Sequence, residues 1–189
     1  MRASSEIITD FVMQKPSNSL TLKKALSYSN GYRELGMHDW AFKEIEALPD
    51  DLKVAVPALQ MQLAISMDAK KWNKALPFAK KLHDVDPEAS ENHVNLAFVM
   101  RRARSMQSAR KVLETAAKKF PGVAIIHYNL ACYACLNKNT EEAKSFLNLA
   151  FELDEAYLKI SLEDEDLEQL RPWIKKAIAI RETGSLDDQ

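Results

Sequence analysis

The chain has 189 residues, 47% of them hydrophobic, and carries 26 basic and 27 acidic side chains for a formal net charge of −1. A nearly neutral chain lacks the overall positive field that gathers nucleic acid or anionic membranes, so any charge-reading partner must use a local patch. No stretch reaches the roughly 20 apolar residues of a membrane-spanning helix, and we expect no membrane insertion. With only four glycines and seven prolines, the composition favours helix and predicts an all-α protein.

The N-terminal segment, residues 1–19, contains a short apolar stretch between Ile7 and Met13 but lacks the layout of a signal peptide. Within it, residues 4–14 are expected to form a cap helix. Cys132 and Cys135 fall inside a helical pattern, which suits a reducing compartment better than a disulfide-rich secreted domain. The sequence therefore predicts a cytoplasmic protein.

A period of 34 residues runs through the chain. Four alanines at this spacing each begin an apolar series with steps of four and three, as on one helical face: Ala41, Ala75, Ala109 and Ala143. Twelve residues before each alanine stands another small or apolar residue: Ser29, Leu63, Ala97 and Ala131. Pro87 and Pro121, again 34 apart, stop helices at unit boundaries. Each unit is therefore predicted to hold two amphipathic helices joined by a short polar linker.

These features resemble the tetratricopeptide repeat family, most clearly in HYNLACYACLNKNTEEAKSFLNLAFELDE (His127 to Glu155) and next in Lys70 to Pro87. The resemblance covers residues 20–155. It implies a right-handed α-α superhelix of four helix-turn-helix repeats, at about 22–55, 56–89, 90–123 and 124–157. The sequence departs from the family pattern at Arg104, where a linker glycine is usual, and at His93 and His127, where a bulky aromatic is usual.

Residues 156–182 resemble the capping segment that closes such arrays, and residues 183–189 are expected to be a flexible tail. The capping segment carries apolar residues between charges: Leu158, Leu162, Leu167, Leu170, Trp173, Ile174 and Ile178. Its acidic run, Glu163 to Glu168, is expected to be a solvated loop and helix start, where negative charge suits the helix dipole, and a partner-binding site is the alternative.

In tetratricopeptide proteins the first helix of each repeat lines a concave groove. The resemblance places twelve residues there: Asn30, Arg33, Gln60, Ala64, Met67, Asn95, Phe98, Arg101, Arg102, Tyr128, Asn129 and Cys132. Asparagines can hold a peptide backbone, arginines bind carboxylates and the apolar side chains add contact area. We therefore expect a protein or peptide partner. The clamp that holds chaperone C-termini in some family members is not predicted, because Leu26, Met61 and Glu91 stand where it needs polar or basic side chains.

No catalytic, cofactor or metal site is predicted. Cys132 and Cys135 form a Cys-x-x-Cys, but neither begins a helix and no second ligand pair is visible, so structural cysteines are favoured. His93 and His127 are one repeat apart, which indicates equivalent packing positions. Neither a nucleophile triad nor a phosphate-binding glycine loop stands out, and no small-molecule substrate is expected.

The stretch from Arg101 to Lys119 holds seven basic residues against one acidic residue, Glu114. A solvated face or an acidic protein partner is favoured over nucleic acid, because interleaved aromatic residues are lacking.

The sequence thus predicts a non-enzymatic scaffold or adaptor that binds a polypeptide in the groove of the array. A chaperone for secretion-system clients and a regulatory subunit of an enzyme complex remain alternatives, and self-association stays open.

Overall fold

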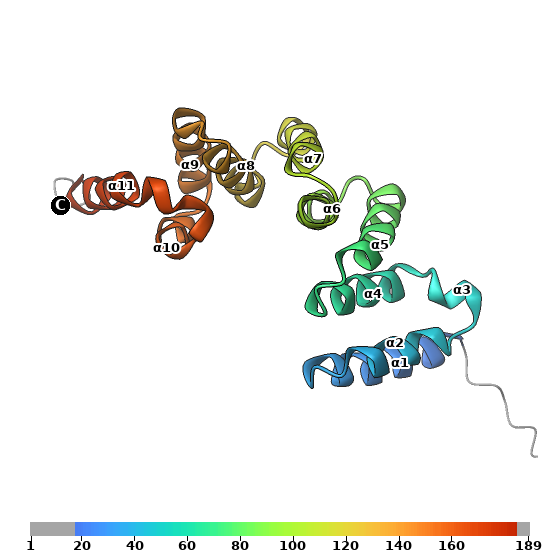
Figure 1. Cartoon of the computed structure of the whole chain (residues 1–189). Helices are drawn as coiled ribbons and strands as arrows, with labels where there is room; N and C mark the ends of the chain where they lie inside the picture. The colour runs from blue at the N-terminus through green and yellow to red at the C-terminus, as the bar shows by residue number, and fades with distance from the viewer. Residues whose placement is uncertain (1–17, 185–189) are drawn as a thin grey trace, which may run out of the picture. The chain divides into compact units, whose positions relative to one another are not determined.

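The computed structural model describes residues 18–184, and every regular element in that range is a helix, as the all-α prediction requires (Figure 1). The predicted cap helix at residues 4–14 and the last five residues of the predicted tail lie outside the described residues. The elements are α1 (Asn18–Glu34), α2 (His38–Glu46), α3 (Asp50–Lys53), α4 (Val56–Asp68), α5 (Trp72–Val85), α6 (Ser90–Ala103), α7 (Met106–Lys119), α8 (Ala124–Leu136), α9 (Thr140–Leu153), α10 (Ala156–Glu163), the 3-10 helix η1 (Glu165–Leu170) and α11 (Arg171–Gly184). None of the helices described has both the length and the apolar character needed to cross a membrane.

The chain divides into two compact units, with α1 to α4 in the first and α5 to α11 in the second. In the first unit, α1 and α2 pack against each other and against α4. One buried cluster of this unit contains Ala25, Ile45, Leu48 and Ala58. Other apolar residues of the unit are buried as well: Ala41, Phe42, Leu59, Leu63 and Ile65. Where α1 crosses α2, the buried hydroxyl of Ser29 donates a hydrogen bond of 2.8 Å to the carbonyl oxygen of Ala41. This bond satisfies a polar group that would otherwise be costly to bury.

The second unit is built around α8. Nine of the 13 residues of α8 are buried, and a helix that is apolar nearly all round must be covered on several sides. Helices α7 and α9 pack on it, as does η1 from the C-terminal part of the chain. The core of this unit extends into the C-terminal helices through Leu158, Leu167, Leu170 and Ile174.

The alanines that mark the 34-residue period are all fully buried: Ala41, Ala75, Ala109 and Ala143. Their partners twelve residues upstream, Ser29, Leu63, Ala97 and Ala131, are also buried. Small side chains at these positions allow close helix packing, since bulk at a crossing forces helices apart.

Helices α1 and α8 end in the same type of turn. After α1, Gly36 has φ +72°, its amide donates to Arg33, and the next amide, of Met37, donates to Tyr32. After α8, Lys138 has φ +62° and the amides of Lys138 and Asn139 make the equivalent bonds. This pairing of bonds is the Schellman motif, whose left-handed position usually holds glycine. Lys138 occupies it without being glycine.

The two histidines that are one repeat apart make the same contact. His93 Nε2 lies 2.9 Å from the carbonyl oxygen of Pro87, and His127 Nε2 lies 2.8 Å from that of Pro121. Both rings are buried. Each histidine therefore ties the start of its helix to the proline that ends the preceding one, which is a structural role.

Candidate functional site

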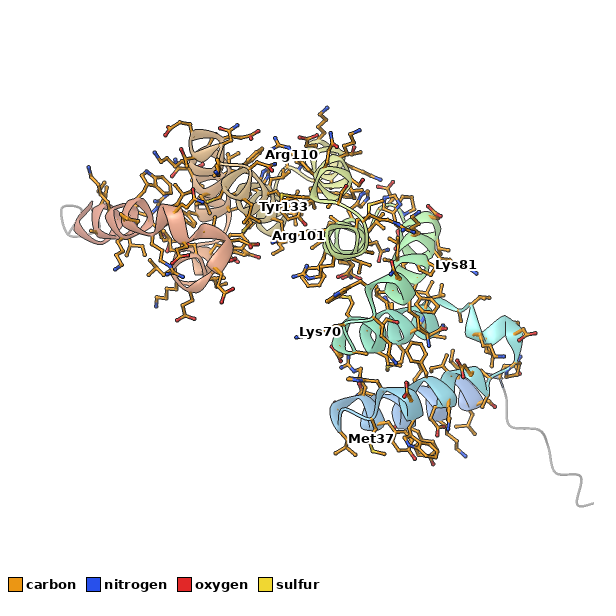
Figure 2. All side chains as sticks on the ribbon, in the orientation of Figure 1. Met37, Lys70, Lys81, Arg101, Arg110 and Tyr133 are labelled. Carbon is orange, nitrogen blue, oxygen red and sulfur yellow. The ribbon has the colours of Figure 1, made fainter. Side chains whose placement is uncertain are left out.

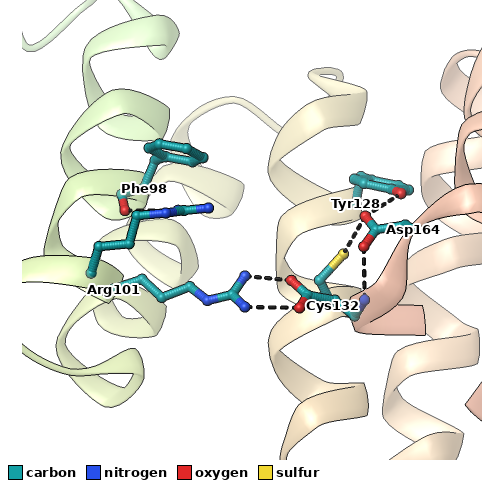
Figure 3. Close-up of polar contacts among 7 residues, drawn as sticks. Phe98, Arg101, Tyr128, Cys132 and Asp164 are labelled. Atoms are coloured by element: carbon teal, nitrogen blue, oxygen red, sulfur yellow. Dashed lines mark hydrogen bonds and ion pairs between the residues drawn. The ribbon is translucent and has the colours of Figure 1, made fainter. Parts of the chain in front are cut away.

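Three of the predicted groove residues, which lie on α6 and α8, contact an acidic segment from the C-terminal part of the chain. Arg101 comes from the last turn of α6, and Tyr128 and Cys132 lie one turn apart on α8 (Figure 3). The segment consists of residues 164–170, which include η1 and join α10 to α11. These elements all belong to the second unit.

Arg101 holds Asp166 through both of its terminal nitrogens. Nη2 donates to Asp166 Oδ1 at 2.9 Å, and Nη1 donates to the second carboxylate oxygen (Figure 3). Both side chains are about three-quarters buried, with exposed fractions of 23% and 25%. A two-pronged guanidinium–carboxylate contact is among the stronger and more directional polar contacts in proteins. The contact raises the pKa of Arg101, chiefly through the hydrogen bonds to Asp166.

Asp164 is held by α8. The hydroxyl of Tyr128 donates to Asp164 Oδ2 at 2.7 Å, and the sulfur of Cys132 lies 3.7 Å from the same oxygen. The other carboxylate oxygen accepts the backbone amide of Asp166 at 2.9 Å and so caps η1. One aspartate therefore both begins the 3-10 helix and fixes it to α8.

Leu167 and Leu170 anchor the segment from beneath. They are 0% and 3% exposed and belong to the core around α8. The expectation of a solvated acidic run is correct for Glu163, Glu165 and Glu168, which are exposed. It is wrong for Asp164 and Asp166, because each finds donors on a neighbouring helix.

Tyr128 and Cys132 are consequently covered and do not form an open groove surface. They are 4% and 2% exposed. Burial raises the pKa of both groups, and the adjacent Asp164 adds to the effect by penalising a second negative charge. A thiol that stays protonated is a poor nucleophile and a poor metal ligand.

A cysteine and two carboxylates form a cluster that resembles a metal site. One ligand atom each of Cys132, Asp164 and Asp166 lies within 4.8 Å of the others. However, Arg101 engages both oxygens of Asp166, and Tyr128 donates to Asp164. The carboxylates thus already have cationic and hydrogen-bonding partners, and the cluster fits a structural network better than an ion site.

Arg102 lies on the other side of Arg101, against two aromatic rings. Its guanidinium carbon is 3.5 Å from the ring centroid of Phe98 and 5.2 Å from that of Trp72. The two rings meet edge to face at 5.9 Å, and Arg102 Nη1 donates to the carbonyl oxygen of Phe98 at 3.2 Å. Within residues 18–184 Arg102 forms no ion pair. Its pKa is lowered by burial and by the charge of Arg101.

Asn95 and Asn129 complete the predicted set in the second unit, and both are half-buried. The other five predicted residues belong to the first unit. There, Asn30 donates to Glu34 at 2.7 Å and Arg33 lies 3.7 Å from Asp68. Gln60 is exposed, whereas Ala64 and Met67 are half-buried.

Sequence reasoning missed three residues of this site, namely Trp72, Asp164 and Asp166. Arg101 and Asp166 are 65 positions apart, so no local periodicity links them. A usable signal was the pair of leucines, Leu167 and Leu170, that directly follows Asp164 and Asp166, since two large apolar residues are unusual in a fully solvated run.

Comparisons with known proteins give a similarity of fold. Neither a protein-family profile nor a curated protein matches the sequence. Among solved structures, a crystal structure of MamA matches with a TM-score of 0.67 and 16% identity over 85% of this chain and 90% of that one. A structure of MamA from MSR-1 matches with a TM-score of 0.61 and 18% identity over 76% and 82% of the two chains. MamA is a tetratricopeptide-like helical protein, and identities this low relate the two folds alone.

Proposed function

We propose that this chain is a non-enzymatic scaffold that binds a partner polypeptide on the face formed by α6 and α8. In this proposal the helical hairpins at about 22–55, 56–89, 90–123 and 124–157 are tetratricopeptide-type repeats of one right-handed superhelix, closed by residues 156–182. Repeats of this kind bury their apolar faces against each other and leave an extended surface for binding.

One observation carries the proposal: residues 164–170 already lie along this face as a bound polypeptide segment would. Arg101, Tyr128 and Cys132, all predicted from the sequence as groove residues, make the contacts. The side chains of α6 and α8 therefore have the reach and chemistry to hold a polypeptide. Phe98, Arg102, Asn95 and Asn129 remain for a partner, since the segment makes no hydrogen bond to them in the described structure.

The non-enzymatic part of the proposal is supported by the state of the reactive groups. Cys132 and Cys135 are buried thiols with raised pKa values. His93 and His127 are engaged with proline carbonyls. These groups serve the packing of the helices, and the all-helical neighbours agree in fold with an interaction scaffold.

Site-specific crosslinking tests the proposal. A photo-crosslinking amino acid is placed at Asn95 or at Asn129 on the proposed face, and at the exposed Gln107 on α7 as the matched control. After irradiation in extract from the native cell, we expect the same partner to be joined at positions 95 and 129 and not at 107. Crosslinks at position 107 alone would place the binding surface on α7. The absence of crosslinks at positions 95 and 129 would contradict binding on the face formed by α6 and α8.

A further inference from the structure

We infer that the basic end of α6 recognises an acidic segment of the partner polypeptide, with Arg102 on the Phe98 ring as the seat for one of its carboxylates. This inference rests on the proposed function and specifies the chemistry of the partner. In this inference Arg101 holds Asp166 of the same chain, and the next residue of α6, Arg102, holds a carboxylate of the partner.

The internal contact shows which chemistry this end of α6 accepts. Arg101 binds a carboxylate from a segment that is distant in sequence, with both terminal nitrogens engaged. Leu167 and Leu170 keep that segment in the core, so the Asp166 carboxylate occupies Arg101 in the folded chain. A partner finds Arg101 filled and Arg102 open.

Arg102 is held in a fixed position before any partner arrives. Stacking on Phe98, the nearby Trp72 and the bond to the Phe98 carbonyl oxygen all restrict its guanidinium. A preorganised guanidinium loses less side-chain entropy when it binds a carboxylate, and a lysine could neither stack nor chelate in this way. The fixed geometry favours a planar anionic group.

Arg102 also lacks a compensating negative charge. It lies beside a second arginine, and only one of the two is neutralised by an aspartate. The Arg102 side chain is exposed, so a partner can reach its charge, and an incoming carboxylate supplies the complementary charge that this end of α6 lacks. The pKa of Arg102 is lowered for these two reasons, burial and the neighbouring arginine.

The surrounding charge indicates the side from which the acidic segment approaches. Residues 70–104 carry eight basic and four acidic side chains, and five lysines with no acidic residue lie between Lys70 and Lys81. Lys70 and Lys81, at the ends of that run, are exposed (Figure 2). The exposed Glu163, Glu165 and Glu168 repel an acidic chain on the opposite side. The partner's acidic residues therefore approach from the α5 side of α6.

The aromatic residues here favour a protein over single-stranded nucleic acid. Binding of bases without sequence preference relies on open aromatic faces for stacking. In this site one face of Phe98 is covered by Arg102, and Trp72 meets the same ring. The site therefore offers little open aromatic surface for a base, and single-stranded nucleic acid is the less favoured ligand.

Fluorescence anisotropy with the full chain tests the inference. The probes are a labelled twelve-residue peptide of Asp-Glu-Gly repeats, a neutral counterpart of Asn-Gln-Gly repeats, and a labelled oligothymidine. We expect the acidic peptide to bind and the neutral one to bind at least about tenfold more weakly, since one charged hydrogen-bonded contact is worth roughly that factor. Arg102→Ala is expected to weaken acidic binding about tenfold and Arg102→Lys to restore it in part.

Arg104→Ala is the matched control, because it removes the same charge from an exposed linker residue two positions away. It is expected to change the affinity less than about twofold, as a rim charge does. Equal losses for Arg102→Ala and Arg104→Ala would reduce the site to general charge attraction and overturn the inference. Tighter, Arg102-dependent binding of oligothymidine would overturn it in favour of nucleic acid.

Absence of acidic-peptide binding would also overturn the inference. Binding of the neutral peptide as tightly as the acidic one, with no effect of Arg102→Ala, would likewise overturn the inference. That result would leave the proposed function intact. The proposed function itself is decided separately by the crosslinks at positions 95 and 129.

Discussion

At the residue scale, Lys138 adopts a backbone conformation that suits glycine. Its φ of +62° is in the left-handed region, which costs a residue with a Cβ about 1 kcal/mol or more. Glycine removes that strain but adds freedom to the unfolded chain, which offsets part of the gain. We expect Lys138→Gly to raise the free energy of unfolding by about 0.5 kcal/mol, measured by urea denaturation.

Gly36→Ala is the reciprocal control, because Gly36 occupies the equivalent turn with φ +72°. It should lower the free energy of unfolding by about 1 kcal/mol. A loss of stability in Lys138→Gly would mean that the lysine side chain contributes more than its backbone strain costs.

His93 and His127 show how far single residues can be predicted. Their separation of one repeat indicated a shared structural role, and the structure gives each histidine an equivalent partner, the carbonyl oxygen of Pro87 for His93 and that of Pro121 for His127. The arginines illustrate the limit. The sequence placed Arg101 and Arg102 on a binding face, but only the fold separates the filled arginine from the open one.

At the element scale, the segment at residues 164–170 lies against the buried Cys132. Asp164 lies against the sulfur, and the Arg101–Asp166 pair fastens the segment to α6. We expect Arg101→Ala with Asp166→Ala to raise the rate of Cys132 labelling by a thiol reagent on the order of tenfold, because local opening becomes easier. The measurement uses Cys135→Ala as background, so that only one thiol reports.

Glu163→Ala is the control for this experiment, because it removes an exposed acidic residue of the same region. Its labelling rate should match that of the background chain. Unchanged labelling in the double variant would show that Leu167 and Leu170 hold the segment without help from the ion pair.

The tie between α7 and α9 predicts a pH dependence. Arg110 donates to both carboxylate oxygens of Glu142, through Nη1 at 3.0 Å and through Nη2. These two hydrogen bonds lower the pKa of Glu142. A carboxylate with a lowered folded-state pKa stabilises the fold above its ordinary range and loses that contribution as the pH falls through the lowered value. The stabilisation is therefore present at pH 7 and fades below about pH 4.

Glu142→Gln should lower the free energy of unfolding at pH 7 by about 1 kcal/mol, since the pair is only partly exposed. The deficit should shrink in urea denaturation at pH 3, because the Glu142 carboxyl of the unfolded chain is then largely protonated and the lowered pKa of the folded chain contributes less stability. A deficit that is the same at pH 3 and pH 7 would contradict the electrostatic origin.

At the scale of the whole molecule, much of the helical layout could be predicted because packing repeats with the sequence. Helices α4, α6 and α8 begin at Val56, Ser90 and Ala124, and the alanines of the period are buried. The path of the chain after α10 could not be predicted. Its contacts join Asp164 and Asp166 to helices more than 30 positions away, and such pairs leave no periodic signal.

The central claim is that α6 and α8 form the face that binds a polypeptide. Hydrogen exchange of the chain, alone and with the partner identified by crosslinking, tests it most directly. We expect slower exchange on binding in residues 90–103 and 124–136, with little change in α7 and α9. Slower exchange confined to α7 and α9, or none at all, would contradict the claim.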